Sequence, residues 1–264
     1  MFIVVVGKPT LLLYRIYKNK LSVKLIVDNF MSNNLGKFSV IVPIFNEEKT
    51  IIKLLNRISE TKKQGFDYEI IVINDGSTDN SLKLLEENKS LYDQLITYEK
   101  NRGKGYAVKK GLENSRGEYI IFQDADLEYD PKDYNKFIEV ITRFEADAII
   151  GSRLIYSEYT RSHNILNKFG NMFITLLFNI LYNTTFTDIY SCYLCFKKNL
   201  LIPDQLTTEG FEQHAEILCK VVKKGNKFYE VPISYNGRTQ KEGKKIKFYH
   251  IFSVIFRIII ERLK

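Results

Sequence analysis

Short apolar runs rich in β-branched residues recur along the chain from Phe38 onward, and polar residues follow each of them. Runs of this length that lack a helical period are typical of buried strands. Helix-forming stretches separate the runs, and strands that alternate with helices predict a doubly wound, mostly parallel α/β sheet. The five predicted strands are Phe38–Ile44, Tyr68–Ile73, Leu95–Tyr98, Glu118–Phe122 and Ala146–Ile150.

Helix-start signals follow several of these strands. We expect one helix to begin near Asn46, a good capping residue ahead of two glutamates, and another to begin through Ser77 after the second strand. A third helix is predicted over Lys104–Asn114, and Pro131 is placed to start a fourth. The polar residues between strand and helix therefore lie at the carboxyl ends of the strands, where sheets of this kind bind ligands.

Two further predicted helices are apolar over most of their circumference. Polar residues recur at three- and four-residue steps from Arg161 to Asn179 and from His250 to Lys264, so each helix carries one narrow polar stripe. Such a helix is either buried or lies in a lipid interface, and polar interruptions argue against a membrane span. We expect one side of each to pack on the domain and the other to meet a membrane. The lysine-rich stretch before the second helix favours anionic headgroups.

Composition and charge narrow the class of protein. The 264 residues fit one large α/β domain, and 45% hydrophobic with 27% charged residues is a globular balance. A net charge of +8 suits nucleic acid, an anionic membrane or phosphorylated substrates, but no nucleic-acid-binding module is recognised, so we expect no nucleic-acid partner. We divide the chain into an extension of unknown role (1–37), the main domain (38–235) and a basic loop with a C-terminal amphipathic helix (236–264).

Cysteine and histidine carry little chemical signal here. Cys192 and Cys195 form a C-x-x-C pair, but no second pair or suitably spaced histidine completes a zinc site. We expect reduced thiols in a cytoplasmic protein. For His214 we expect a hydrogen-bonded structural role.

Asp124 and Asp126 directly follow the fourth predicted strand. Two carboxylates one residue apart at a strand end can chelate Mg²⁺ or Mn²⁺, which can bridge the phosphates of a nucleotide and neutralise charge on a leaving group. An isolated D-x-D is more often a solvated turn. The buried strand before this pair favours the metal site.

Two further segments follow strands in the same way. Asp75 can accept hydrogen bonds from a nucleobase or a ribose, or it can cap the following helix. Residues 101–105 contain Arg102, Lys104 and two glycines just before a helix, and a helix start of this kind can bind phosphate. The alternative is a solvated basic turn.

Together these segments resemble the family 2 glycosyltransferases of the GT-A (Rossmann-like) fold, over about two-thirds of the chain. The resemblance implies a nucleotide-sugar donor, with contacts at Pro43, Glu47 and Asp75 and with Lys104 close by. It also implies that Asp124 and Asp126 hold the metal and the diphosphate. The resembling segments are Val40–Glu48, Val72–Asp79, Asn101–Gly105 and Gln123–Leu127.

The downstream half resembles the polyprenyl-phosphate sugar transferases, which include the dolichol-phosphate mannose synthases. This resemblance implies that Arg153, Arg238 and Lys244 face the acceptor phosphate or the donor diphosphate. Glu128 stands where those relatives often have a glutamine near the metal, and we count it as a third metal ligand. The sequence also departs from the family pattern at Ser191-Cys192 and Gln213-His214. The resembling segments are Gly151–Arg153, Thr187-Asp188, Gly210–Glu212 and Tyr235–Arg238.

We therefore expect an inverting, metal-dependent transferase on the cytoplasmic face of a membrane, with a polyprenyl (dolichyl or undecaprenyl) phosphate acceptor. Arg153 and Arg238 would orient that phosphate. A sugar hydroxyl of a surface glycan is the alternative acceptor and would need a base such as Glu212. A nucleotidyltransferase and an inactive nucleotide-sugar binder are the remaining alternatives. A processive synthase is disfavoured because the chain has no tryptophan for the usual signature.

Overall fold

A computed structural model describes residues 38–62, 68–155, 165–238 and 250–264. They form one seven-stranded sheet with the order β3-β2-β1-β4-β6-β5-β7. β6 runs antiparallel to its neighbours β4 and β5, and the other pairings are parallel, so the predicted fold class is confirmed. The strands are β1 (Phe38–Ile44), β2 (Tyr68–Asp75), β3 (Gln94–Tyr98), β4 (Tyr119–Phe122), β5 (Ala148–Ser152), β6 (Leu194–Lys197) and β7 (Phe228–Pro232).

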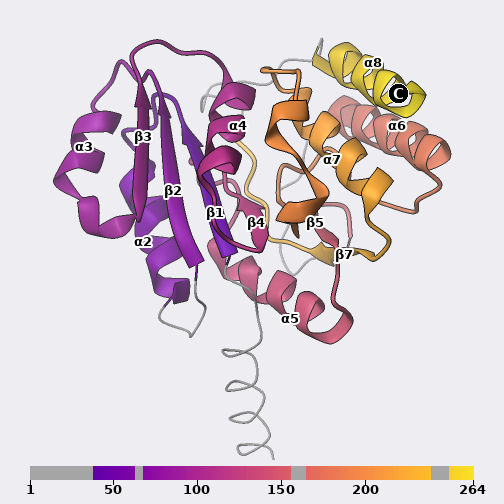
Figure 1. Cartoon of the computed structure of the whole chain (residues 1–264), viewed down its shortest axis with the longest axis horizontal. Helices are drawn as coiled ribbons and strands as arrows, with labels where there is room; N and C mark the ends of the chain where they lie inside the picture. The colour runs from indigo at the N-terminus through magenta and orange to yellow at the C-terminus, as the bar shows by residue number, and fades with distance from the viewer. Residues whose placement is uncertain (1–37, 63–67, 156–164, 239–249) are drawn as a thin grey trace, which may run out of the picture. The chain divides into compact units, whose positions relative to one another are not determined.

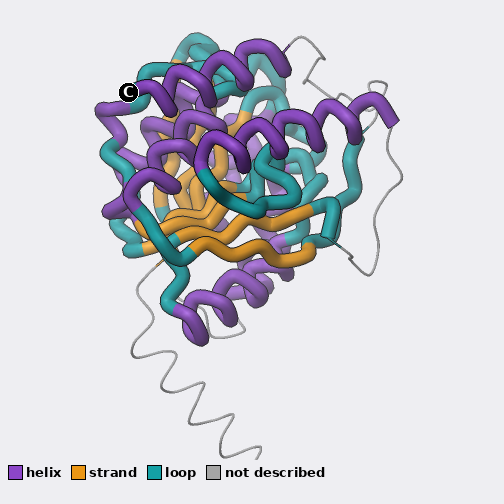
Figure 2. Tube along the Cα trace, turned by 90° about the vertical axis from the view of Figure 1, so that its right-hand side faces the viewer, coloured by secondary structure: helices purple, strands orange, loops and turns teal. Residues whose placement is uncertain are grey.

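Helices cover both faces of this sheet, as the two orthogonal views show (Figures 1 and 2). α4 packs on β1 and β2, while α6, α7 and α8 pack on one another and share with α4 a single apolar core. The helices are α2 (Ile51–Lys62), α3 (Ser81–Glu87), α4 (Lys104–Asn114), α5 (Tyr134–Phe144), α6 (Ile165–Tyr182), α7 (Gln213–Lys224) and α8 (His250–Leu263). None of the described helices is long and apolar enough to cross a bilayer.

Two predicted helix starts are wrong by several residues. The helix expected near Asn46 begins at Ile51, and the one expected through Ser77 begins at Ser81. The reason is a contact between the two loops. Asn46 adopts a left-handed backbone (φ 54°), its N–H donates to Ser77 Oγ at 3.0 Å, and its Oδ1 accepts from Thr78 N at 2.8 Å. These side chains join two strand-to-helix loops instead of capping their own helices.

The polar residues Asn171, Thr175 and Asn179 of α6 face the protein together with the core residues Ile174 and Phe178, while a second set of apolar residues faces outward. Asn171 and Thr175 are buried. Asn179 donates from Nδ2 to Phe186 O at 2.7 Å and accepts at Oδ1 from Phe186 N at 3.0 Å. α8 has the same arrangement, since Glu261 is buried while Phe252 is 65% exposed. We call the exposed apolar side chains of the two helices the apolar surface: Ile165, Phe169, Met172, Phe173, Leu176 and Ile180 of α6, and Phe252, Phe256, Ile259 and Leu263 of α8.

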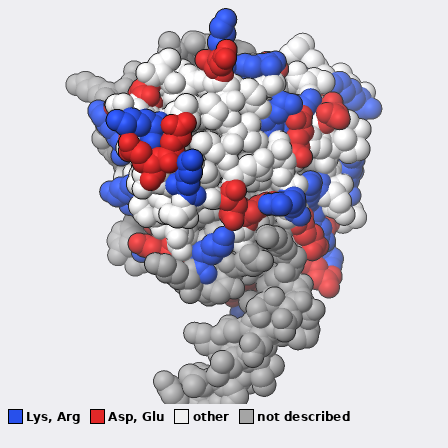
Figure 3. Space-filling view, turned by 60° about the vertical axis from the view of Figure 1, so that its left-hand side comes forward, with Lys and Arg blue, Asp and Glu red and all other residues white. Residues whose placement is uncertain are grey.

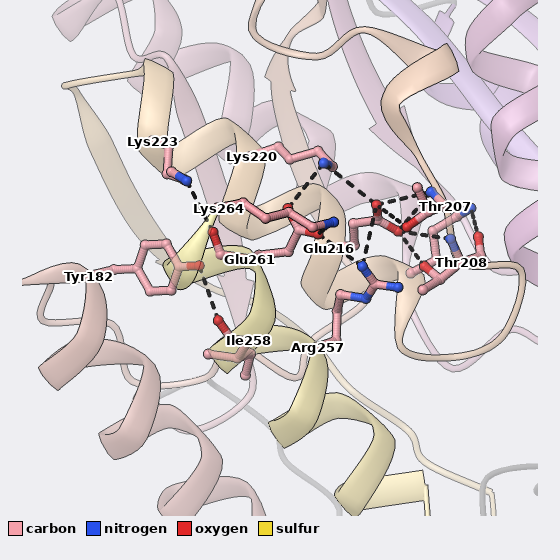
Figure 4. Close-up of polar contacts among 11 residues, drawn as sticks. Tyr182, Thr207, Thr208, Glu216, Lys220, Lys223, Arg257, Ile258, Glu261 and Lys264 are labelled. Atoms are coloured by element: carbon pink, nitrogen blue, oxygen red, sulfur yellow. Dashed lines mark hydrogen bonds and ion pairs between the residues drawn. The ribbon is translucent and has the colours of Figure 1, made fainter.

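A network of charged residues fastens α8 to α7 (Figure 4). Glu261 accepts from Lys220 Nζ at 3.0 Å and from Arg257 Nη1 at 2.9 Å. Glu216, fully buried on α7, lies 3.6 Å from the same lysine and accepts from the backbone N–H groups of Thr207 and Thr208 at 3.0 Å. Paired and hydrogen-bonded in this way, the charges can be buried without a large desolvation penalty. The network explains why the polar side chains Arg257 and Glu261 of α8 lie against α7 and not in solvent.

Candidate active site

The Asp124–Asp126 pair lies at the carboxyl end of β4, on a sharply turned backbone. Gln123, fully buried, anchors the end of the strand: its N–H donates to Ile41 O at 3.0 Å, and its side chain accepts from Tyr134 at 2.8 Å. Leu127 then adopts a left-handed conformation (φ 63°). The turn brings both carboxylates out at the sheet edge, as the strand pattern predicts.

Four carboxylates and two cations gather at this edge. Lys104 Nζ lies 2.5 Å from Asp124 Oδ1, and Arg238 Nη2 lies 2.7 Å from Asp126 Oδ2. The same guanidinium lies 3.3 Å from Glu128 and 3.7 Å from Glu47. The structure thus brings together side chains from four segments far apart in the chain, all of which the sequence singled out.

Burial and the negative charge gathered at this edge shift the pKa of one carboxyl group, that of Asp126. Burial, together with the neighbouring charges of Asp124 and Glu128, raises the pKa of Asp126 to about 7 against the opposing effect of Arg238. Burial alone would lower the pKa of Lys104, but Asp124 holds it above its usual range. Further positive charge at this position would relieve the repulsion among the carboxylates.

The donor set fits a divalent cation, although no group of three metal-ligating side chains is preformed among the described residues. Mg²⁺ is commonly held by one or two carboxylates, with substrate phosphates and water completing its shell. Asp124 and Asp126 meet that requirement with hard oxygen donors. Each aspartate also pairs with a cation, and Glu128 is engaged by both of its oxygens, which accept from Arg238 N at 2.9 Å and from Tyr235 Oη at 2.6 Å. Its assignment as a third metal ligand stays a prediction.

Asp75 organises the loop that precedes α4. Its two carboxylate oxygens accept from the backbone N–H groups of Arg102 and Gly103 at 2.9 and 2.8 Å, and its carbonyl accepts from Asn101. Gly103 has φ +100°, a conformation that other residues rarely adopt. The carboxylate therefore holds the glycine turn beside Lys104, and its predicted contact with a nucleotide stays a prediction.

The same turn packs tightly against the segment before α7. Gly105 N donates to Glu209 O at 2.8 Å, and a Cβ on Gly105 would lie 2.6 Å from that backbone. The segment 207–212 is thus held at one end by Glu216 and in its middle by the start of α4. Glu212, the predicted base for a hydroxyl acceptor, lies at its end with its carboxylate close to Gly210.

Arg153 is held by a buried carboxylate. Its Nε and Nη2 donate to the two oxygens of Asp188, each at 2.7 Å, and its guanidinium lies 5.1 Å from the ring centroid of Tyr235. Asn171 on α6 donates to the same carboxylate at 2.7 Å. Arg153 is therefore rigidly oriented and linked to α6, and its predicted contact with a phosphate stays a prediction.

Lys244 lies outside the described residues. The excess positive charge does not gather into one stripe on the face shown in Figure 3, where the Lys and Arg side chains of the described residues are interspersed with Asp and Glu.

A small cavity beside Asp124 is lined in part by residues that were not predicted to belong to the site. It measures about 30 Å³, and its lining includes Lys104, Tyr190, Gln213 and His214 as well as Pro43. His214 is hydrogen-bonded to the Ser191 backbone, in line with the structural role expected for it, but its buried Nε2 has no hydrogen-bond partner among the described residues. The available signal was the departure from the family pattern at Gln213-His214. The three cysteines are free thiols, as expected.

Comparison with known proteins gives concordant results. The family model described as "Glycosyl transferase family 2" matches residues 39–201. The chain is 31% identical over 204 residues to an uncharacterised protein of Methanocaldococcus jannaschii, covering 74% of this chain and 86% of that protein. It is 31% identical to the dolichyl-phosphate beta-glucosyltransferase of Saccharomyces cerevisiae and 30% identical to the dolichol-phosphate mannosyltransferase of Pyrococcus furiosus. These matches cover 75% and 79% of this chain but only 66% and 59% of those two proteins.

Solved structures share the fold. Glucosyl-3-phosphoglycerate synthase from Mycobacterium tuberculosis, in complex with Mn²⁺, uridine diphosphate and phosphoglyceric acid, aligns with a TM-score of 0.65 at 17% identity, over 88% of this chain and 80% of that one. S. aureus TarS in complex with UDP-GlcNAc aligns with a TM-score of 0.59 at 22% identity, over 85% and 66%.

Proposed function

The chain belongs to glycosyl transferase family 2 and is a glycosyltransferase, and we propose that it transfers a sugar from a nucleotide-sugar donor to the phosphate of a polyprenyl lipid at a membrane surface. Two relatives are named for transfer to dolichyl or dolichol phosphate. A protein of the same fold binds uridine diphosphate with Mn²⁺. The names of the two relatives support a lipid-phosphate acceptor, and the uridine diphosphate complex supports a nucleotide-linked donor.

The link between α6 and Arg153 carries the proposal for the acceptor. The outward side of α6 is apolar, and its inward side donates from Asn171 to Asp188 at 2.7 Å. Asp188 in turn orients Arg153 through two hydrogen bonds. One helix thus joins a surface suited to lipid and a cation suited to phosphate. A polyprenyl phosphate has an apolar chain for the first and a phosphate group for the second.

The apolar surface supports attachment to a membrane. Its side chains are large and belong to two helices that pack together, and Phe169 and Phe173 are each 59% exposed. Complete burial of such a side chain is worth about 1.5–3 kcal/mol relative to water, so a few of them suffice for reversible binding. The protein would lie on the membrane with α6 and α8 in the interface.

On the donor side, Asp124 and Asp126 would hold Mg²⁺ or Mn²⁺ at the diphosphate. The cation would neutralise charge that develops on the leaving nucleotide. Lys104, 2.5 Å from Asp124, adds a fixed positive charge at the same place. Asp75 keeps the glycine turn in position and so fixes the place of Lys104 beside Asp124.

On the acceptor side, the chain needs no strong general base. A lipid phosphate is already an anion at neutral pH, so its oxygen can attack the anomeric carbon directly. Attack from the face opposite the leaving diphosphate inverts the configuration. Arg153 and Arg238 would orient the phosphate and reduce the repulsion between two anionic groups. Glu212 would be required only for a hydroxyl acceptor.

The test is transfer in vesicles. Wild-type protein is incubated with Mn²⁺, with radiolabelled UDP- and GDP-sugars, and with vesicles that contain dolichyl or undecaprenyl phosphate. The matched control contains the same lipid as its free alcohol. We expect labelled lipid only with the phosphate. Equal transfer to the alcohol, or release of label as free sugar alone, would contradict the proposed acceptor.

A further inference from the structure

The small cavity beside Asp124 has a chemical character that the proposed mechanism does not use. It lies between the end of β4 and the start of α7, and its lining includes Lys104, Asp124 and Cys192. Three polar side chains from two other segments complete it: Tyr190, which precedes β6, and Gln213 and His214, which begin α7.

Each of these three side chains has a buried polar atom without a hydrogen-bond partner among the described residues: Tyr190 Oη, Gln213 Oε1 and His214 Nε2. Unpaired buried polar atoms are rare in folded proteins because each lowers the stability of the fold. Gln213 is 2% exposed, and its Nε2 is held by the carbonyl of Thr208, so its oxygen cannot turn away to solvent. Three side chains that line one cavity and each carry such an atom indicate partners that arrive with a ligand.

The chemistry of the three atoms selects the kind of ligand. Gln213 Oε1 can only accept a hydrogen bond, and Tyr190 Oη can donate and accept. Burial, aided by the charge of Lys104, lowers the pKa of His214 to about 4, so the imidazole is neutral at pH 7. A hydroxyl group, which donates one bond and accepts others, matches this set. A phosphate would place its negative charge against an acceptor oxygen.

The size and position of the cavity narrow the ligand further. Its volume of about 30 Å³ accommodates one or two water-sized groups, so it has room for a substituent and not for a sugar ring. Asp124 and Lys104 line the same cavity and belong to the proposed diphosphate site. The transferred sugar is bonded to the second phosphate, which puts its hydroxyl groups within reach.

We propose that Tyr190, Gln213 and His214 form a recess that binds one hydroxyl or hydroxymethyl group of the donor sugar and thereby selects which sugar is transferred. The inference rests on the proposed donor site. Two of the three residues, Gln213 and His214, stand where the sequence departs from the family pattern, and the proposal gives them the task of sugar discrimination.

The experiment compares donors with and without individual hydroxyl groups. The wild type is first tested with UDP-glucose, UDP-galactose, UDP-N-acetylglucosamine and GDP-mannose, and the preferred donor is then replaced by its monodeoxy analogues at each ring position and at C6. We expect removal of one particular hydroxyl to lower kcat/KM about 10- to 100-fold, because the recess is then left unpaired. In Tyr190→Phe and His214→Phe the same removal should change kcat/KM by less than about threefold. Tyr92→Phe, whose hydroxyl bonds to Leu85 O far from the cavity, is the matched control and should discriminate as the wild type does.

Two further measurements separate recognition from structure. The affinity for UDP or GDP without a sugar should be the same in the variants and the wild type. The thermal unfolding midpoint should not fall in Tyr190→Phe, since the hydroxyl oxygen removed has no partner among the described residues. In His214→Phe it should fall only slightly, because the ring also loses its hydrogen bond to the Ser191 backbone. Unchanged discrimination at every position in both variants would overturn the recess while leaving the proposed function intact, and would indicate that the cavity holds only water. No turnover of any donor by the wild type would contradict the proposed function itself, and the recess with it.

Discussion

Asp188 holds Arg153 through two hydrogen bonds of 2.7 Å, from Nε to Oδ2 and from Nη2 to Oδ1. The carboxylate is fully buried, and it also accepts from the Arg153 backbone N–H and from Asn171. Asp188 therefore connects the helix with the outward apolar face to the cation proposed for the acceptor phosphate.

Removal of Asp188 should destabilise the protein strongly. In Asp188→Ala the Arg153 guanidinium would stay buried without its counter-charge, and breaking such a pair costs about 3–5 kcal/mol. Urea unfolding should report a loss of that size. The control is Asp204→Ala, because the Asp204 side chain is 89% exposed and its pair with Lys109 should contribute less than about 1 kcal/mol. Equal losses of stability in both variants would show that the buried pair contributes no more than the exposed one.

The contribution of Asp188 should also depend on pH. Burial alone would raise the pKa of Asp188, but the charge and hydrogen bonds of Arg153, with Asn171, hold it below its usual range. A carboxyl whose pKa is lower in the folded state stabilises the fold above its unfolded pKa, about 3.9, and this contribution is lost as pH falls through the folded pKa. The difference in free energy of unfolding between wild type and Asp188→Asn should be constant above about pH 5 and shrink below about pH 4. A difference that grows on acidification would contradict the pairing.

The network between α7 and α8 predicts a second large effect. Glu261 is buried and pairs with Lys220 and Arg257, so Glu261→Gln should leave two cations poorly compensated and cost about 3 kcal/mol or more. Lys264→Ala removes a half-exposed partner of the same carboxylate and should cost less than about 1 kcal/mol. Chemical unfolding of the two variants measures both. A Glu261→Gln protein as stable as Lys264→Ala would mean that α8 is not fastened by this network.

The apolar surface predicts binding to lipid. Phe169→Gln combined with Phe252→Gln should reduce partition into anionic vesicles by tenfold or more, because each exposed ring contributes up to about 1.5–3 kcal/mol when it is buried in the interface. The stability in solution should hardly change, since both rings are exposed by more than half. Phe144→Gln, on α5 and 46% exposed, is the matched control and should bind vesicles normally. Vesicle sedimentation measures the bound fraction. Equal binding by the wild type, the double variant and the control would exclude the apolar surface as the membrane contact.

Elements with strong local signals were predictable from the sequence. The strand Phe38–Ile44 and the helix Lys104–Asn114 match β1 and α4 residue for residue. A β-branched run defines the first, and a glycine turn followed by good helix formers defines the second. β6, only four residues long, was missed because it is defined by antiparallel pairing with β4 and β5 far away in the chain.

The sequence predicted at which edge of the sheet the candidate site lies. It did not predict which side chains of the site pair with one another. Parallel strands bring their carboxyl ends together, so Asp75 and Asp124 were expected on one edge. The pairing of Arg153 with Asp188 joins residues 35 positions apart, and no spacing rule reveals it. The same holds for the direction of the polar stripe of α6, which depends on the buried carboxylate that meets Asn171.

Transfer by Asp124→Ala is the most direct measurement of the central claim, that Asp124 and Asp126 hold the leaving diphosphate through a divalent cation. In vesicles with polyprenyl phosphate and saturating Mn²⁺, the variant should form labelled lipid at least about 100-fold more slowly than the wild type. Asp130→Ala, a carboxylate of the same loop whose side chain bonds to Lys132 N, should stay close to the wild-type rate. Near-normal transfer by Asp124→Ala at saturating Mn²⁺ would contradict the account.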